Sequence, residues 1–157
     1  FPPEKIPGNV NEFLGYFMPR KVMCGKALLR ASGTVLRKLG KWLGEKGYIT
    51  RDQARSMTKR AGCATKELPA AVDLADMLNQ AASMRGQGLT EQAEGYFEVR
   101  AVGEASLAVK GVGPNLKATV HVPPEAAKIC RPGWTISGCL GKGRDGAEFI
   151  EVWNVYA

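Results

Sequence analysis

Residues 25–46 read GKALLRASGTVLRKLGKWLGEK, and this stretch decides how the first half of the chain folds. A helix turns by about 100° per residue, which sorts these side chains into an apolar side and a basic side. The side expected to face the core holds Leu28, Ser32, Val35, Leu36, Leu39, Trp42 and Leu43. The opposite side holds Lys26, Arg30, Thr34, Arg37 and Lys41. The pattern predicts an amphipathic helix with a basic stripe.

Small residues interrupt this helix. Ser32-Gly33-Thr34 suggests a break followed by a new N-cap, and Gly47 suits the position after the last turn. Gly33, Gly40 and Gly44 each cost about 1 kcal/mol relative to alanine, so a close approach should compensate them. Either a neighbouring helix or a phosphate backbone fits there.

Further helices are expected on both sides of this stretch. Residues 11–17 form a short helix whose aromatic side chains belong to the core and which Pro19 stops or bends. Thr50-Arg51-Asp52-Gln53 has the form of a capping box and starts a helix that runs to about Arg60. A last helix begins at Pro69, runs to about Met84 and packs the bundle closed.

From about residue 95 the apolar pattern alternates as in strands. Five strands are expected over residues 96–102, 106–112, 116–122, 133–140 and 147–156, with a short helix over 123–128. This order favours a small OB-like barrel, with an SH3-like barrel as the competitor. Taking Arg85-Gly86-Gln87-Gly88 as a linker, we predict an α+β protein with a helical domain over 1–86 and a barrel over 87–157.

The charge of the 157-residue chain is unevenly distributed. The formal net charge is +7 overall, but residues 1–66 carry +10 and residues 67–157 carry −3. A cationic helical surface favours polyanions such as DNA or RNA, although it also suits an acidic protein. The expected nucleic-acid-binding residues are Lys26, Arg30, Arg37, Lys38, Lys41, Arg51, Arg55 and Lys59.

Two segments resemble a known family. Phe13-Leu14-Gly15-Tyr16-Phe17 and residues 31–49 are similar to the opening helix and the S-x-x-T-[VI] and L-x-x-[FW]-L-x-x-[KR]-G motifs of the SAM-like core-binding domain of tyrosine recombinases. The resemblance implies a helical module that grips duplex DNA, and it points to Arg30, Arg37, Lys38 and Lys41. The catalytic domain of that family has no counterpart here, so recombinase activity is not expected.

Catalytic and metal-binding patterns are sparse. The sequence has no G-x-S-x-G, P-loop or H-E-x-x-H motif, so we expect neither an enzyme nor a cofactor. His121 should lie on a strand surface, and the widely spaced Cys24, Cys63, Cys130 and Cys139 should be buried thiols rather than zinc ligands. No apolar run is long enough to span a membrane, and no signal peptide is evident, which favours a cytoplasmic protein. The initial Phe1 suggests a fragment of a longer chain.

Two functions are compatible with these patterns. The first is binding of nucleic acid, with duplex DNA favoured over RNA, by the helical domain, while the barrel serves in regulation or dimerisation. The second is a protein-interaction adaptor or a homodimer that docks through the glycine-lined face and ignores nucleic acid. The barrel aromatics are more typical of core than of base stacking: Tyr96, Trp134, Phe149, Trp153 and Tyr156.

Overall fold

The computed structural model of this chain describes residues 2–22, 25–84, 90–112, 116–143 and 146–157. It divides into two compact units, Phe1–Pro69 and Ala70–Ala157. The division falls inside one long helix, α4 (Arg51–Met84), rather than at the boundary of 86 and 87 expected above. Pro69 does not start a helix, because it lies within α4. The predicted linker at 85–88 lies outside the described residues.

The first unit opens with one continuous helical segment. It consists of η1 (Pro3–Lys5), α1 (Ile6–Glu12), the π-helical turn η2 (Phe13–Phe17) and α2 (Met18–Lys21). Pro19 does not stop this segment. The N–H of Met18 reaches back five residues to the carbonyl of Phe13, and this widened turn allows the helix to continue past the proline.

The aromatic side chains of η2 do not belong to the core, contrary to the prediction. Leu14 is fully buried, whereas Phe13, Tyr16 and Phe17 are 38–45% exposed. Phe13 stacks on Phe17 with ring centroids 5.7 Å apart, and the Arg20 guanidinium lies 5.4 Å from the centre of the Tyr16 ring. The helix therefore turns its leucine inward and its aromatic rings outward.

Helix α3 (Lys26–Glu45) is unbroken through the Ser-Gly-Thr sequence where a break was suggested. The Ser32 hydroxyl donates to the carbonyl of Leu29 at 2.8 Å, and the Thr34 hydroxyl donates to that of Arg30 at 3.1 Å, so both bond within the helix instead of capping a new one. The predicted end is confirmed. Gly47 has a φ of +75°, and the N–H of Tyr48 bonds to the carbonyl of Leu43 as in a Schellman motif.

The glycines of α3 lie against the first half of α4, which decides between the two alternatives for them. A Cβ on Gly33 would lie 2.7 Å from the carbonyl oxygen of Ala61, and one on Gly44 would lie 2.7 Å from the Cβ of Ala54. Because of this contact, the buried side of α3 differs from the side that the apolar pattern predicted. Leu29 and Leu43 are buried, but Leu28, Val35 and Trp42 are 51%, 61% and 47% exposed.

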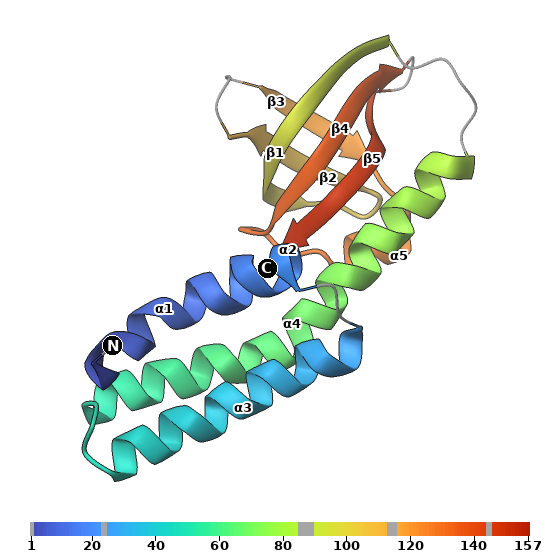
Figure 1. Cartoon of the computed structure of the whole chain (residues 1–157). Helices are drawn as coiled ribbons and strands as arrows, with labels where there is room; N and C mark the ends of the chain where they lie inside the picture. The colour runs from blue at the N-terminus through green and yellow to red at the C-terminus, as the bar shows by residue number, and fades with distance from the viewer. Residues whose placement is uncertain (1, 23–24, 85–89, 113–115, 144–145) are drawn as a thin grey trace. The chain divides into compact units, whose positions relative to one another are not determined.

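The capping box at the start of α4 is confirmed. The N–H of Gln53 donates to the Thr50 hydroxyl at 3.2 Å, and the N–H of Thr50 donates to the Gln53 side-chain oxygen at 2.9 Å. Two N–H groups of the first turn are thereby satisfied. Figure 1 shows α1, α3 and the first half of α4 lying side by side in this unit.

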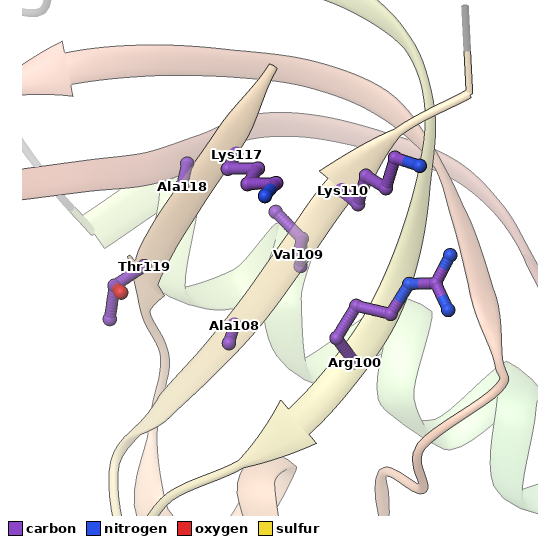
Figure 2. A pocket seen from close by; sticks show the side chains of 7 residues that line it. All are labelled: Arg100, Ala108, Val109, Lys110, Lys117, Ala118 and Thr119. Carbon is purple, nitrogen blue, oxygen red and sulfur yellow. The ribbon is translucent and has the colours of Figure 1, made fainter. Parts of the chain in front are cut away.

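The described residues of the second unit form five strands, as predicted: β1 (Thr90–Val102), β2 (Ser106–Gly111), β3 (Lys117–His121), β4 (Thr135–Gly143) and β5 (Gly146–Tyr156). The pairing order is β1-β2-β3-β5-β4, with β4 also paired to β1, so each strand has two neighbours. All pairs are antiparallel except β3 with β5. The predicted short helix is α5 (Pro124–Ile129), between β3 and β4. On β2 and β3, Lys110 lies directly opposite Lys117 (Figure 2).

The second half of α4 belongs to this unit. The prediction that it closes the helical bundle is therefore wrong. Ala71, Leu74 and Leu78 join the apolar core formed by the strands and α5. The Asn79 amide donates to the carbonyl of Val152 at 2.8 Å, and its side-chain oxygen accepts from the N–H of the same residue, also at 2.8 Å. This pair of bonds fixes the helix to β5.

Candidate nucleic-acid interface

A shallow groove of about 700 Å³ runs between α3 and the first half of α4. It lies beside the glycine contact, where the missing side chains bring the two helices together. Its walls hold four cations and one carboxylate, that of Glu45. The lining residues are Lys41, Gly44, Glu45, Arg51, Ala54, Arg55, Thr58 and Lys59.

Four of the eight predicted binding residues therefore meet in one place. Lys41 comes from α3, and Arg51, Arg55 and Lys59 come from α4. On α4 these three positions are four residues apart in succession, so they repeat about once per turn along one flank. The sequence separates Lys41 from Lys59 by 18 residues, and the helical hairpin brings them to the same groove.

The other four predicted residues differ in their positions. Arg37 lies on the α3–α4 contact, where its Cδ is 4.0 Å from the point at which a Cβ of Gly62 would stand. Arg30 and Lys38 are exposed on α3, outside the groove lining, and Lys26 is half-buried at the start of that helix. Lys26, Arg30 and Lys38 therefore lie on α3 but outside the groove.

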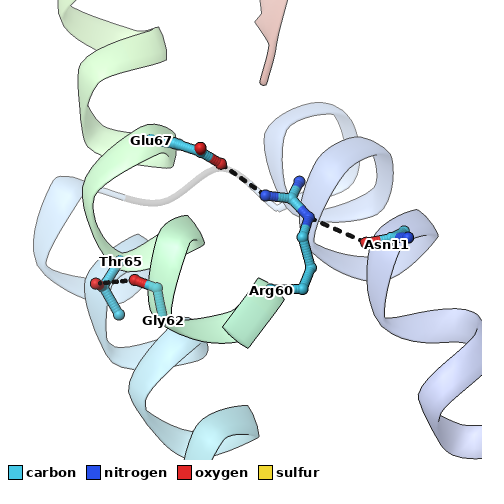
Figure 3. Close-up of polar contacts among 5 residues, drawn as sticks. All are labelled: Asn11, Arg60, Gly62, Thr65 and Glu67. Atoms are coloured by element: carbon cyan, nitrogen blue, oxygen red, sulfur yellow. Dashed lines mark hydrogen bonds and ion pairs between the residues drawn. The ribbon is translucent and has the colours of Figure 1, made fainter. Parts of the chain in front are cut away.

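Arg60, which follows Lys59 on α4, makes internal contacts. Its Nε donates to the Asn11 side-chain oxygen at 3.0 Å, and its Nη1 lies 2.6 Å from a carboxylate oxygen of Glu67 (Figure 3). Both charged groups are about three-quarters buried. Arg60 therefore ties α1 to α4, and the cationic surface narrows to the flank that faces α3.

The single carboxylate of the groove offsets little of its positive charge. Glu45 lies 3.7 Å from the Lys41 ammonium one turn away, and both side chains are more than half exposed. Exposed pairs of this kind contribute at most about 1 kcal/mol and are screened by salt. Lys41 can therefore exchange this partner for a phosphate at small cost. Thr58, whose hydroxyl donates to the carbonyl of Ala54, adds a neutral polar group to the wall.

Residues typical of metal or redox chemistry are dispersed. Among the residues that the structure describes, no three His, Cys, Asp or Glu side chains gather in a way that would hold a metal ion. His121 is exposed on β3, as predicted. Cys130 and Cys139 are buried, but Cys63 is exposed, contrary to the prediction, and Cys24 is outside the described residues. Burial raises the pKa of the Cys130 thiol to about 11, which disfavours the reactive thiolate.

Sequence reasoning missed a second set of cations, Arg100, Lys110 and Lys117, which line a hollow on the strands of the second unit. The net negative charge of that half concealed them. The strand alternation of residues 106–112 and 116–122 was a signal for finding them, because it places lysines on one side of two neighbouring strands.

Within the described parts of the chain, no helix has the length and apolar character needed to span a membrane. The sequence matches no protein-family model and no curated protein.

Proposed function

We propose that this protein binds nucleic acid, with duplex DNA as the preferred form, through the groove between α3 and α4. One observation carries the proposal. Four cations from two helices converge on a groove whose lining contains a single carboxylate. Contacts from Lys and Arg to phosphates supply most of the affinity of such proteins and require no particular base sequence. The role is one of binding, without catalysis.

The form of the groove supports binding along a phosphate backbone. Lys41 of α3 lies on one side of the groove, and Arg51, Arg55 and Lys59 of α4 lie on the other. Arg51, Arg55 and Lys59 repeat about every 6 Å along α4, as helical geometry requires. A single strand of the duplex can place successive phosphates along such a row. The resemblance of residues 13–49 to a DNA-gripping module stays a prediction that favours duplex DNA.

We further propose that the five strands form an OB-type barrel with a regulatory or dimerising role. The order β1-β2-β3-β5-β4, with β4 returning to β1 and a helix between β3 and β4, supports this type over the SH3-like one. The groove proposal and the barrel proposal are independent of each other, because all residues that line the groove belong to the first unit.

The test is a binding titration with a fluorescein-labelled 20-base-pair duplex at 50 mM salt. The double variant Arg55→Glu/Lys59→Glu should bind more than tenfold more weakly than the native protein, because two phosphate contacts become repulsive. The control, Lys5→Glu/Lys21→Glu, makes the same change of net charge at exposed sites outside the groove and should lose less than threefold. Equal losses in both variants would contradict the groove as the binding site.

A separate observation favours a second function, contact with another protein copy. Leu28, Val35 and Trp42 are all about half exposed or more and lie seven residues apart on α3. Residues seven apart lie on the same side of a helix, as one position of a heptad does, so these three form an exposed apolar stripe. A concentration-dependent dimer in sedimentation velocity that Val35→Glu abolishes would support this function, and a monomer at 100 μM would exclude it. The glycine-lined face of α3, which the sequence suggested as the docking face, is covered by α4.

A further inference from the structure

A second cationic cluster lies in the second unit, although that half of the chain is net negative. It lines a hollow of about 490 Å³ over β1, β2 and β3, and the lining includes no carboxylate. Figure 2 shows Arg100, Lys110 and Lys117 projecting from three successive strands. The other lining residues are Ala108, Val109, Ala118 and Thr119.

The register of the sheet makes this cluster unusual. Lys110 and Lys117 are direct partners across the antiparallel pair of β2 and β3. On its other side Lys110 lies opposite Glu98 of β1, so one carboxylate neighbours the three cations. Directly opposed residues have Cβ atoms only about 5 Å apart, and like charges in that arrangement destabilise a sheet. An anion between the two ammonium groups would convert this repulsion into attraction.

Arg100 is added to the cluster by an irregularity in β1. Val99 pairs with Val109, but Ala101 pairs with Ala108, so Arg100 is an extra residue in a bulge. Bulges redirect side chains and are common beside binding sites. The Arg100 guanidinium lies 2.8 Å from the Glu98 carboxylate, but its side chain is 55% exposed. An exposed pair of this kind is weak, so the guanidinium can turn to a stronger anion.

An exposed aromatic ring lies next to the cations. Tyr96 is 38% exposed and lies on the same side of β1 as Glu98, two residues away. The N–H of Val112 donates to its carbonyl, which sets the 61% exposed Val112 beside it. Trp134 and Phe149 are buried in the core, as expected for them, whereas Tyr96 is partly exposed and forms an aromatic pair with Tyr156, with ring centroids 6.1 Å apart.

We propose that this face of β1, β2 and β3 binds single-stranded nucleic acid, with phosphates on Arg100, Lys110 and Lys117 and a base on Tyr96. Strands lie about 4.8 Å apart, so the three cations cover about 10 Å, which suits successive phosphates rather than one isolated ion. A row of cations next to an exposed aromatic ring is the combination that binds single strands with little sequence preference. The site is separate from the groove and does not depend on it.

The test uses the full chain with Arg55→Glu/Lys59→Glu as the background, so that the groove contributes little. Labelled dT10 should still bind at 50 mM salt, and adding Lys110→Ala/Lys117→Ala should weaken that binding more than tenfold. Tyr96→Ala should also weaken it, while leaving the salt dependence unchanged, since stacking releases no counterions. The control Lys128→Glu, at an exposed lysine of α5, should change the affinity less than threefold.

A stability measurement separates binding from structural damage. Lys117→Glu places opposite charges across β2 and β3, so it should raise the Tm by about 1–4 °C while it weakens dT10 binding. A variant that is both more stable and weaker in binding cannot owe its weakness to unfolding. A lower Tm would contradict the repulsion on which the proposal rests.

The outcomes distinguish this proposal from the preceding one. If the background variant does not bind dT10, or if the lysine substitutions leave dT10 binding unchanged, the sheet site is wrong, and the groove proposal is unaffected. If unlabelled duplex displaces dT10 from the background variant as well as unlabelled dT10 does, the preference for single strands is wrong. If dT10 binding depends on Lys110 and Lys117 while duplex binding ignores the groove, only the groove proposal fails.

Discussion

Replacing Gly33 with alanine tests whether a close helix contact shapes the first unit. In an ordinary helix this substitution stabilises the protein by up to about 1 kcal/mol. Here the new Cβ would lie 2.7 Å from the carbonyl oxygen of Ala61 and 3.0 Å from the backbone N of Thr65. Because both are backbone atoms, α3 and α4 must move apart.

The expected cost follows from these distances. Overpacking of this kind typically destabilises a protein by about 1–3 kcal/mol, which outweighs the gain in helix propensity. Gly33→Ala should therefore lower the free energy of unfolding by about 1–2 kcal/mol. For a unit of this size each kcal/mol corresponds to about 4–8 °C in Tm.

Gly62→Ala is the matched control on the facing helix. The nearest atom to its new Cβ is the Arg37 Cδ at 4.0 Å, an ordinary contact, so the propensity gain should remain. Urea unfolding followed by circular dichroism at 222 nm measures both variants. If Gly33→Ala proves as stable as Gly62→Ala, the close contact between α3 and α4 is refuted.

Three further predictions concern local contacts. Thr50→Ala should destabilise α4 by about 1 kcal/mol in thermal unfolding, whereas Thr50→Ser should retain the cap and the stability. Asn79→Ala should cost about 2–3 kcal/mol, seen as a lower urea midpoint by near-UV circular dichroism, because two backbone groups of Val152 lose their partner; an unchanged midpoint would mean that water replaces the amide. The folded-state pKa of Cys130, raised from 9.0 to about 11, means that its contribution to stability is present below pH 9 and is lost as the pH rises toward 11. Stability should therefore decline more steeply from pH 8.5 to 10.5 in the native protein than in Cys130→Ala, and peptide mass spectrometry should find Cys63 alkylated well before Cys130.

Local signals in the sequence were sufficient to predict the ends of helices and the course of the strands. The Thr50 capping box and the Gly47 cap depend on neighbouring residues only, and both are confirmed. The alternation of apolar residues likewise predicted five strands and α5 near their observed positions. These features were predictable because the interactions that fix them lie within a few residues.

The buried side of α3 was not predictable from hydrophobicity. Glycine carries no apolar side chain, yet Gly33 and Gly40 are buried because α4 lies against them, while Val35 is exposed. The continuity of α4 through Pro69 was not predicted either, because a proline usually starts, bends or ends a helix, whereas α4 contains it. The tertiary contact with α4 decided which side of α3 is buried.

The cations of the proposed binding groove were predictable as a set but not as a site. Charge counting located Lys41, Arg51, Arg55 and Lys59, and only the hairpin brought them to one groove. It also included Arg60, which an internal partner, Glu67, removes from the surface. Counting the charge by halves concealed the cations of the sheet, because the carboxylates of residues 67–157 outnumber the Lys and Arg side chains of that half.

The most direct test of the central claim is the salt dependence of duplex binding. If Lys41, Arg51, Arg55 and Lys59 each neutralise one phosphate, log K should fall with log[salt] at a slope of about −3.6, which is roughly a 150-fold loss between 50 and 200 mM. In Arg55→Glu/Lys59→Glu the slope should be no steeper than about −1.8. A native slope shallower than about −1, or a slope that the double variant leaves unchanged, would contradict nucleic-acid binding by this groove.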